Sequence, residues 1–323
     1  MSGIRSVALR ALGSMVSPAN KRARLSILIY HRVLSEPDPL VPGTIDARTF
    51  ERQMAALARH FHVLPLSEAV RLHQQGCLPS RAAAITFDDG YEDNARIALP
   101  ILKRNGVPAC FFVATGFLDG GMMWNDVIIE SLRVARGGRI DLNTLGIGCL
   151  SIDGLAERRA ALRAIIDALK YRPAQERDAA VDLVRSACNV QLSVKLMMST
   201  QDVQRLHREG MEIGGHTITH PILAQVGDDE ARREILGGKH RLEEILGTPV
   251  ELFAYPNGKP GRDYTPAHVG MVRELGFKAA LSTQWGAASA VSDCYQLPRF
   301  TPWDRSPDRF VLRLYQNCMR GTA

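Results

Sequence analysis

Short apolar runs alternate with longer amphipathic stretches along most of the chain. The runs have the length of strands and lie at 25–30, 62–64, 82–87, 109–114, 211–215, 251–254, 277–282 and 295–300. Between them, apolar side chains recur three and four positions apart, which is the spacing of one helix face. Because continuous apolar runs are typical of strands buried on both faces, the pattern predicts a parallel α/β fold, most simply a barrel or partial barrel.

Capping residues and glycines indicate where the helices begin and end. Asp46 or Thr49 is expected to cap a helix over 48–60, and Ser67 a helix that reaches residue 75. Further helices are expected at 94–105, 200–209, 228–246, 265–275 and from Ser306-Pro307-Asp308 onward.

The alternation of strands and helices lapses between Asp119 and about Thr200. Amphipathic helices are expected at 124–136, 155–170 and 174–188, with a hairpin around 140–152. This stretch has few strands and is short for an independent domain. We therefore expect a helical insertion at about 119–200 within a barrel domain that spans residues 25–323.

Residues 1–24 form a separate amphipathic segment. One helical face carries its apolar residues, which are Ile4, Val7, Ala8, Ala11, Leu12, Met15 and Val16. Such a face packs against its own domain or lies on a membrane surface. The chain has no 18-residue apolar span, and its first residues lack the apolar core of a signal peptide. We expect a cytoplasmic protein, with peripheral contact at the inner membrane as an alternative.

Composition excludes several classes of protein. An apolar fraction of 46% and a charged fraction of 23% are those of an ordinary globular protein. The net charge is +6, but Lys and Arg are scattered, so no nucleic-acid partner is expected. The six cysteines lie far apart without a C-x-x-C pair, which argues against a disulfide framework or a zinc knuckle.

Candidate chemistry begins where the run 82–87 ends, in T-F-D-D-G-Y. Asp88 and Asp89 follow a buried strand directly, and open α/β sheets and barrels keep their chemistry at this end of their strands. Adjacent residues at a strand end point in different directions. The two carboxylates can therefore have two roles, one binding a metal and one moving protons.

Two histidines follow another predicted strand, in H-T-I-T-H-P. His216 and His220 are four positions apart, a spacing that allows both rings to reach one metal. With a carboxylate they make a His-His-Asp site for one divalent ion, which we expect to be Zn²⁺, with Co²⁺ or Ni²⁺ as alternatives. A third strand ends in F-A-Y-P-N-G, a loop whose backbone N–H groups can face a developing oxyanion.

In this order, T-F-D-D-G-Y, H-T-I-T-H-P and F-A-Y-P-N-G resemble the motifs of the polysaccharide deacetylase family, the NodB-homology or family 4 carbohydrate esterases. The resemblance extends from about residue 25 to 305, outside the insertion. It implies a distorted (β/α)7 barrel and metal-dependent hydrolysis of acetyl groups on a sugar polymer. Asp89, His216 and His220 resemble the metal ligands and Asp88 the catalytic base, and the N–H of Asn257 lies where the family has its oxyanion donor.

Two positions differ from the common family pattern. Ala254-Tyr255-Pro256-Asn257 stands where many members have R-x-P-Y, and Leu297-Pro298-Arg299 where many have L-x-H. The arginine held against the base and the acid histidine are therefore absent from their usual places. Tyr30-His31 and F-A-Y-P resemble a branch that acts on poly-N-acetylglucosamine-type exopolysaccharides. We expect His31, at the end of a core strand, to be the general acid, and Arg299 to contact Asp88.

The favoured function is removal of acetyl groups from N-acetylated sugars of a polysaccharide or lipid-linked glycan, with an acetylated carbohydrate as the substrate. Substrate contacts are expected from Tyr91, Trp124 and Tyr255, and also from the rim residues 35–43, Asn125 and Trp285. Two alternatives stay open: a metal-dependent amidase acting on a small C–N bond outside sugars, and a non-catalytic sugar-binding relative.

Overall fold

The computed structural model describes residues 3–320 of the chain, which divides into two compact units. The first contains the described residues up to Glu36, residues 45–119 and residues from Met198 onward. The second contains residues 37–44 and 120–197.

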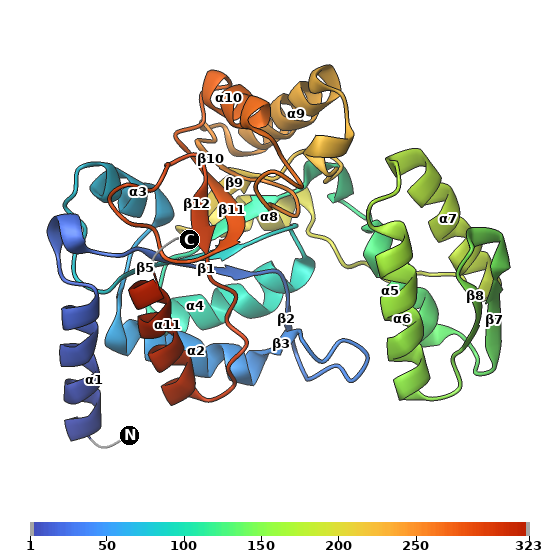
Figure 1. The fold of residues 1–323 in the computed structure, drawn as a ribbon, viewed down its shortest axis with the longest axis horizontal. Coiled ribbons are helices and arrows are strands. Elements are labelled where there is room, and N and C mark those ends of the chain that lie inside the picture. Colours follow the sequence, from blue (N-terminus) through green and yellow to red (C-terminus); the bar gives the residue numbers. More distant parts are fainter. Residues whose placement is uncertain (1–2, 321–323) are drawn as a thin grey trace. The chain divides into compact units, whose positions relative to one another are not determined.

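Parallel strands of the first unit form one sheet (Figure 1). Their order is β1 (Ser26–Tyr30), β5 (Ala82–Phe87), β6 (Cys110–Val113), β9 (Glu212–Gly215), β10 (Leu252–Ala254), β11 (Ala279–Trp285) and β12 (Leu297–Arg299), with β4 (His62–Val63) beside β5. Phe300, just after β12, bridges to Leu28 of β1, and its N–H donates to Ile27 at 2.7 Å. The sheet is therefore nearly closed, and the predicted α/β barrel is confirmed. Two short strands, β2 (Val33–Leu34) and β3 (Ile45–Asp46), pair separately.

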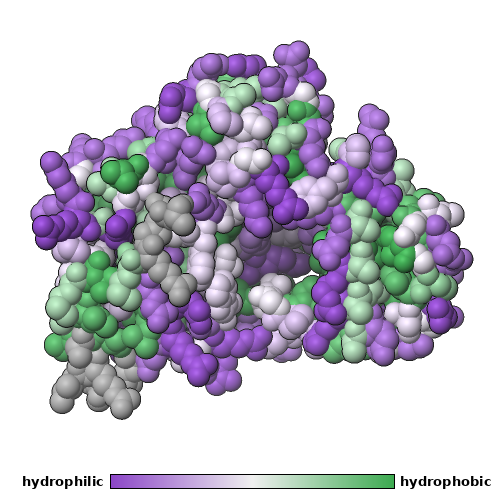
Figure 2. Space-filling view, viewed as in Figure 1, coloured by the Kyte–Doolittle hydropathy of each residue, from purple (hydrophilic) through white to green (hydrophobic). Residues whose placement is uncertain are grey.

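Helices of the first unit pack against this sheet. They are α1 (Gly3–Val16), α2 (Ala47–His60), α3 (Leu66–Gln74), α4 (Leu99–Asn105), α8 (Thr200–Arg208), α9 (Asp228–Leu246), α10 (Pro266–Glu274) and α11 (Pro307–Arg320). Helix α1 is the predicted amphipathic segment, and it packs beside α2 and α11. Val7, Leu12 and Met15 nevertheless stay exposed on it, in a region where Figure 2 shows apolar surface. Among the described residues, no helix is long and apolar enough to cross a membrane.

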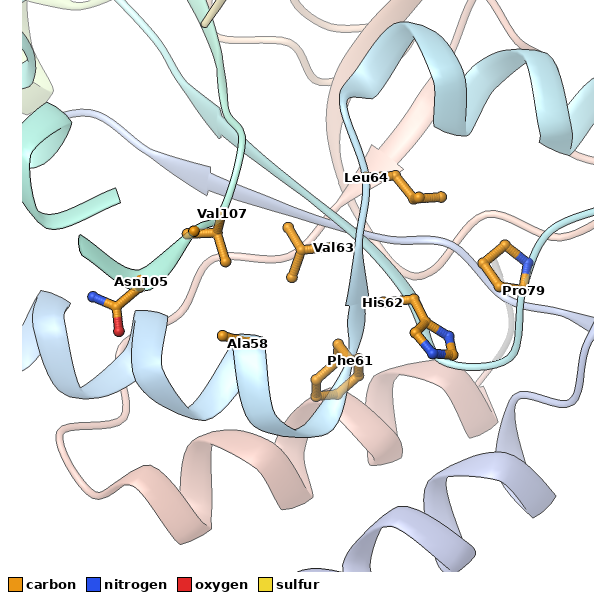
Figure 3. Close-up of a pocket in the computed structure, with 9 residues that line it drawn as sticks. Ala58, Phe61, His62, Val63, Leu64, Pro79, Asn105 and Val107 are labelled. Carbon is orange, nitrogen blue, oxygen red and sulfur yellow. The ribbon is translucent and has the colours of Figure 1, made fainter. Parts of the chain in front are cut away.

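A groove of about 540 Å³ lies beside β4, at the beginning of β5 (Figure 3). Its lining residues are Ala58, Phe61, His62, Val63, Leu64, Pro79, Asn105, Gly106 and Val107. Because β4 pairs with Ala82 and Ala83, the first residues of β5, the groove lies at the opposite end of that strand from Asp88 and Asp89. It is therefore separate from the predicted chemistry.

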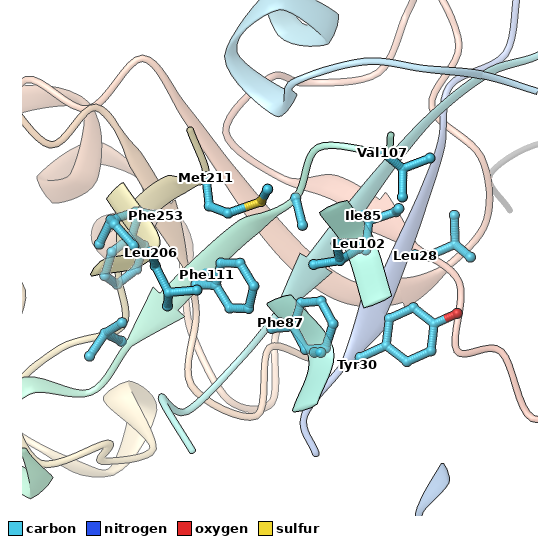
Figure 4. Packing of buried hydrophobic residues seen from close by; sticks show 14 of the residues in the cluster. Leu28, Tyr30, Ile85, Phe87, Leu102, Val107, Phe111, Leu206, Met211 and Phe253 are labelled. Carbon is cyan, nitrogen blue, oxygen red and sulfur yellow. The ribbon is translucent and has the colours of Figure 1, made fainter. Parts of the chain in front are cut away.

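Alternation along β5 separates the two faces of the barrel wall. Tyr30, Phe87 and Phe111 are neighbours in register on β1, β5 and β6, and their rings stack in a row beneath the helices (Figure 4). Burying one such ring contributes roughly 1.5–3 kcal/mol. Ala82 and Ala84 belong to the other face and pack in the barrel interior. The same alternation places Thr86 and Asp88 on the interior side.

The capping residue at the start of a helix could be predicted from the local sequence for α2 but not for α3. Asp46 caps α2 by accepting from the Thr49 N–H, as predicted, and Ser199 caps α8. The prediction that Ser67 caps α3 was wrong, since α3 begins at Leu66 after Pro65. The N–H groups of Leu66 and Ser67 donate instead to the carboxylate of Glu212, a residue far away in sequence.

The second unit has its own apolar core. It contains α5 (Trp124–Val134), α6 (Leu155–Leu169), α7 (Ala174–Ala187) and an antiparallel hairpin of β7 (Arg139–Leu142) and β8 (Gly148–Ser151). The three predicted helices and the hairpin are thus confirmed. Residues 37–44 join this unit, because Arg133 makes two hydrogen bonds to Asp38 and Arg159 donates to the Pro39 carbonyl. The sequence alone does not indicate that this segment belongs with residues 120–197.

Candidate active site

Three side chains converge where β5 and β9 end. The Nε2 atoms of His216 and His220 each lie 3.4 Å from Oδ1 of Asp89. Each of the three residues offers one ligand atom, and these three atoms all lie within 4.8 Å of one another. The structure therefore brings together the three residues predicted as metal ligands.

The turn that carries both histidines has an unusual backbone, and α9 holds it. Thr217 and His220 have positive φ angles of 68° and 57°, a conformation that few side chains adopt. Glu234 of α9 accepts from the N–H groups of Ile218 and Thr219 at 2.9 and 2.8 Å. A Cβ at Gly238 would lie only 2.7 Å from the Thr217 carbonyl oxygen, so glycine allows α9 to approach the turn.

The three converging residues fit a divalent cation. The Nδ1 of His216 hydrogen-bonds the Ala254 carbonyl at 2.7 Å, which leaves its Nε2 for a metal. Oδ1 of Asp89 is buried without a hydrogen-bond partner in the described part of the chain. Two ligands about 2.0–2.1 Å from one tetrahedral ion are roughly 3.3–3.4 Å apart, which matches the spacing of each histidine from Asp89. Two imidazoles and one carboxylate suit Zn²⁺ and its neighbours.

Asp88 is not one of the three converging residues and is paired with Arg299. The guanidinium makes two parallel hydrogen bonds to the carboxylate, each 2.7 Å, and both side chains are buried. Arg299 also donates to the Ser282 carbonyl at 2.8 Å, which fixes its orientation. Burial raises the pKa of Asp88, but the Arg299 charge leads several opposing effects that together leave that pKa below its usual value. The predicted contact is confirmed, and the carboxylate is ionised at neutral pH.

The protonation of the histidines is set by burial and by the two aspartates. Burial lowers the pKa of His220 to about 4, so its ring is neutral at neutral pH. Burial also lowers the pKa of His216, but its interactions with Asp89 and Asp88 raise it overall. For Asp89, burial raises the pKa, and the interaction with His216 leads the opposing effects that bring it below its usual value.

His31 follows β1 at the same end of the barrel. Its side chain is exposed, and its electrostatic interaction with Asp88 and Asp89 contributes to lowering the pKa of both carboxyl groups. Its loop is held by Asp93, which accepts from the side chain of Arg32 at 2.8 Å and from the N–H of Val33 at 3.0 Å. His31 thus stands on a tethered loop at the end of the barrel where Asp88 and Asp89 lie.

The loop after β10 has a fixed backbone. Asn257 has a φ of 58°, and its carbonyl accepts from Thr283 Oγ1 at 2.6 Å. Gly258 has a φ of 71°, and a Cβ there would lie 2.9 Å from the Thr283 nitrogen, so a side chain is excluded. Within residues 3–320, no hydrogen bond is made by the Asn257 N–H, so this donor is free to bind a ligand.

Two residues predicted to contact substrate, Tyr255 and Tyr91, are buried. Tyr255 is fully buried, stacks on Tyr264 and donates its hydroxyl hydrogen to the Tyr295 carbonyl. That prediction was wrong, because the end of β10 turns this ring toward the helices. Tyr91 is also buried, with the Arg32 guanidinium over its ring, which leaves it no surface for a substrate.

Trp124 lies in the second unit, at the start of α5. The guanidinium of Arg177 lies over its ring at 5.2 Å. Its predicted contact with substrate stays a prediction.

Sequence reasoning missed the residues that hold the site, chiefly Glu234, Asp93 and Gly238. Asp93 had a local signal, since it follows Asp88 and Asp89 by a few positions in D-D-G-Y-E-D-N. Glu234 and Gly238 had none, because they belong to an ordinary charged helix and act through a turn that precedes it.

Comparison with known proteins assigns this arrangement to a family. Residues 75–136 and 174–280 match the family model described as polysaccharide deacetylase, which is more than half of the chain. The chain belongs to the polysaccharide deacetylase family.

Two curated relatives match over shorter stretches. One is named "Putative polysaccharide deacetylase YxkH" of Bacillus subtilis, 38% identical over 95 residues, or 29% of this chain and 33% of the relative. The other is a peptidoglycan-N-acetylglucosamine deacetylase of Bacillus cereus, 37% identical over 57 residues, or 18% of this chain and 21% of the relative. The matches thus span a third or less of these relatives.

Solved structures share the fold over nearly the whole chain. The Streptococcus pyogenes deacetylase PplD in complex with acetate has a TM-score of 0.61 at 19% identity, covering 90% of this chain and 98% of that one. IcaB from Ammonifex degensii has a TM-score of 0.58 at 19% identity, covering 94% and 98%. At these identities the likeness shows the fold.

Proposed function

We propose that this polysaccharide deacetylase family member is a metal-dependent hydrolase that removes acetyl groups from N-acetylated sugars of a polysaccharide or lipid-linked glycan. The observation that carries the proposal is the ionised Asp88, clamped by Arg299, next to the cluster of Asp89, His216 and His220. The names of the relatives, one of them an N-acetylglucosamine deacetylase, support an N-acetyl substrate.

Each residue has one part in the proposed hydrolysis. Asp89, His216 and His220 would hold one divalent cation, best matched by Zn²⁺, which when bound polarises the acetyl carbonyl and lowers the pKa of water. Asp88 accepts the proton of the attacking water. The Asn257 N–H donates to the carbonyl oxygen as negative charge develops there. His31 donates a proton to the amine that leaves.

A non-catalytic sugar-binding role is not favoured by this arrangement. Burying Asp88, Asp89 and Arg299 together is costly unless each is paired, and Oδ1 of Asp89 has no partner among the described residues. A binding module needs no such oxygen, whereas a metal centre does. The small-amide alternative differs only in the substrate and is decided by the assay below.

Acetate release tests the proposal directly. The purified chain is incubated with a β-linked N-acetylglucosamine pentamer, an O-acetylated xylan and acetamide, and acetate and new primary amines are both quantified. We expect equimolar acetate and amine from the pentamer. Release only from acetamide would favour the small-amide alternative, release only from the xylan would favour an esterase, and no release from any of the three would contradict the proposal.

Replacement of His31 tests the proposed general acid. We expect His31→Ala to lower kcat on the pentamer by about 10²–10⁴-fold with metal content unchanged, since expulsion of an amine requires protonation. His62→Ala removes another exposed histidine, at the other end of the barrel, and serves as the matched control. A kcat for His31→Ala within about twofold of the control would exclude His31 as the acid.

We also propose that α1 lies on an anionic membrane surface, which fits a cytoplasmic protein peripheral at the inner membrane. Its exposed Val7, Leu12 and Met15 are accompanied by exposed basic side chains at Arg10 and Lys21. We expect co-sedimentation with phosphatidylglycerol vesicles but not with phosphatidylcholine vesicles, and its loss in Leu12→Asp/Met15→Asp. Val291→Asp, at an exposed apolar residue elsewhere, is the control. Equal sedimentation of all variants would contradict the proposal.

A further inference from the structure

Two tryptophans stand exposed side by side on the first unit. Trp285 ends β11 and Trp303 follows β12, and they expose 42% and 53% of their surface. Their ring centroids are 5.5 Å apart, with the planes inclined by 37°. Large aromatic side chains exposed together are uncommon on a folded protein and mark surfaces that bind something.

Buried groups hold both rings in place. Phe300 is fully buried beneath them, with its centroid 5.7 Å from that of Trp285 and 6.0 Å from that of Trp303. The Arg313 guanidinium lies 5.2 Å from the Trp303 ring and is itself bound to the carboxylate of Asp304. The pair is therefore a rigid platform, which loses little conformational entropy when a ligand binds.

Strand register puts this platform at the same end of the barrel as the candidate active site. Trp285 pairs with Arg299, the residue that clamps Asp88. Phe300 is bridged to Leu28 of the neighbouring strand β1. Trp303 comes three residues after Phe300, and His31 comes three residues after Leu28, so both follow the same end of the sheet. Both tryptophans thus lie where the strands end, at the end of the barrel that also carries the proposed base and acid.

We propose that Trp285 and Trp303 form a subsite for a sugar ring adjacent in the polymer to the ring that loses its acetyl group. Indole faces offer flat apolar surface, and the C–H faces of a pyranose ring stack on such surface while its hydroxyl groups stay in water. Two inclined planes suit an extended sugar chain better than a small amide. This inference rests on the proposed function and specifies its substrate as an oligosaccharide or polymer.

The test compares substrate lengths. The values of kcat/KM are measured for the β-linked N-acetylglucosamine pentamer and dimer with the wild-type chain, Trp285→Ala, Trp303→Ala and the conservative Trp303→Tyr. Each alanine variant should raise KM for the pentamer on the order of 3- to 10-fold, with kcat and the dimer values unchanged. Trp303→Tyr should recover most of the loss, and Val291→Ala, at a residue 91% exposed elsewhere, should change nothing.

The outcomes separate this inference from the proposed function. A wild-type chain that releases acetate from neither length would count against the proposed function itself. An active wild type whose pentamer-to-dimer ratio is unchanged in both alanine variants would overturn the subsite. A fall in kcat on both lengths would also overturn it, because that result assigns the tryptophans to the structure of the site rather than to sugar binding.

Discussion

Asp88→Asn is expected to abolish turnover while leaving the metal affinity unchanged. An amide has nearly the shape of the carboxylate but cannot accept the proton of the attacking water. Asp88 is bound to Arg299 and is not one of the three converging ligands. We expect kcat to fall by at least about 10²–10⁴-fold, measured by acetate release together with the metal content of the purified variant.

His216→Ala is the matching variant for the metal ligands, and it should lose both turnover and metal. Only a ligand contributes directly to metal affinity, so the two variants separate the base from the ligand set. His62→Ala, far from the site, should keep both properties. Equal metal loss in Asp88→Asn and His216→Ala would show that the roles of Asp88 and Asp89 are assigned wrongly.

Arg299→Ala is expected to have the largest effect on stability. It leaves the Asp88 carboxylate buried without its partner, and breaking one side of a buried pair costs about 3–5 kcal/mol. It also removes the hydrogen bond to the Ser282 carbonyl. The free energy of unfolding is measured by denaturant titration at pH 7. The comparison is Arg313→Ala, which removes the more exposed partner of the Arg313–Asp304 ion pair.

Removing both charges tests whether the stability lost in Arg299→Ala comes from the unpaired Asp88 carboxylate or from lost packing. In Asp88→Asn/Arg299→Met, no buried charge is left unpaired, so we expect part of the stability lost in Arg299→Ala to return. Activity should stay absent in the double variant. A cost below about 1 kcal/mol for Arg299→Ala would contradict the bidentate buried pair.

The barrel and the metal cluster could be predicted because local patterns determine them. The run 82–87 is small or apolar apart from Thr86, which is typical of a strand buried on both faces. Side-chain alternation then separates Asp88 from Asp89. The contact of Arg299 with Asp88 followed from both residues ending strands at one end of the barrel. These inferences need strand ends and side-chain alternation but no tertiary detail.

Other features depend on contacts between distant segments. The direction of Tyr255 is set by how β10 ends against the helices, and its buried stack on Tyr264 has no local signal. At the start of α3, the Glu212 carboxylate, rather than the Ser67 hydroxyl, accepts hydrogen bonds from the backbone N–H groups. The support of the His216 turn by Glu234 likewise joins a loop to the helix after it. Each case is a tertiary contact that overrides or supplements a local preference.

The central claim is that the cluster of Asp89, His216 and His220 is a metal centre on which deacetylation depends. The most direct measurement is acetate release from the N-acetylglucosamine pentamer by the chain after dialysis against a chelator, followed by titration with Zn²⁺. The account predicts that activity disappears in the metal-free protein and returns in full at one Zn²⁺ per chain, with no return in His216→Ala. Undiminished acetate release by the metal-free protein would contradict it.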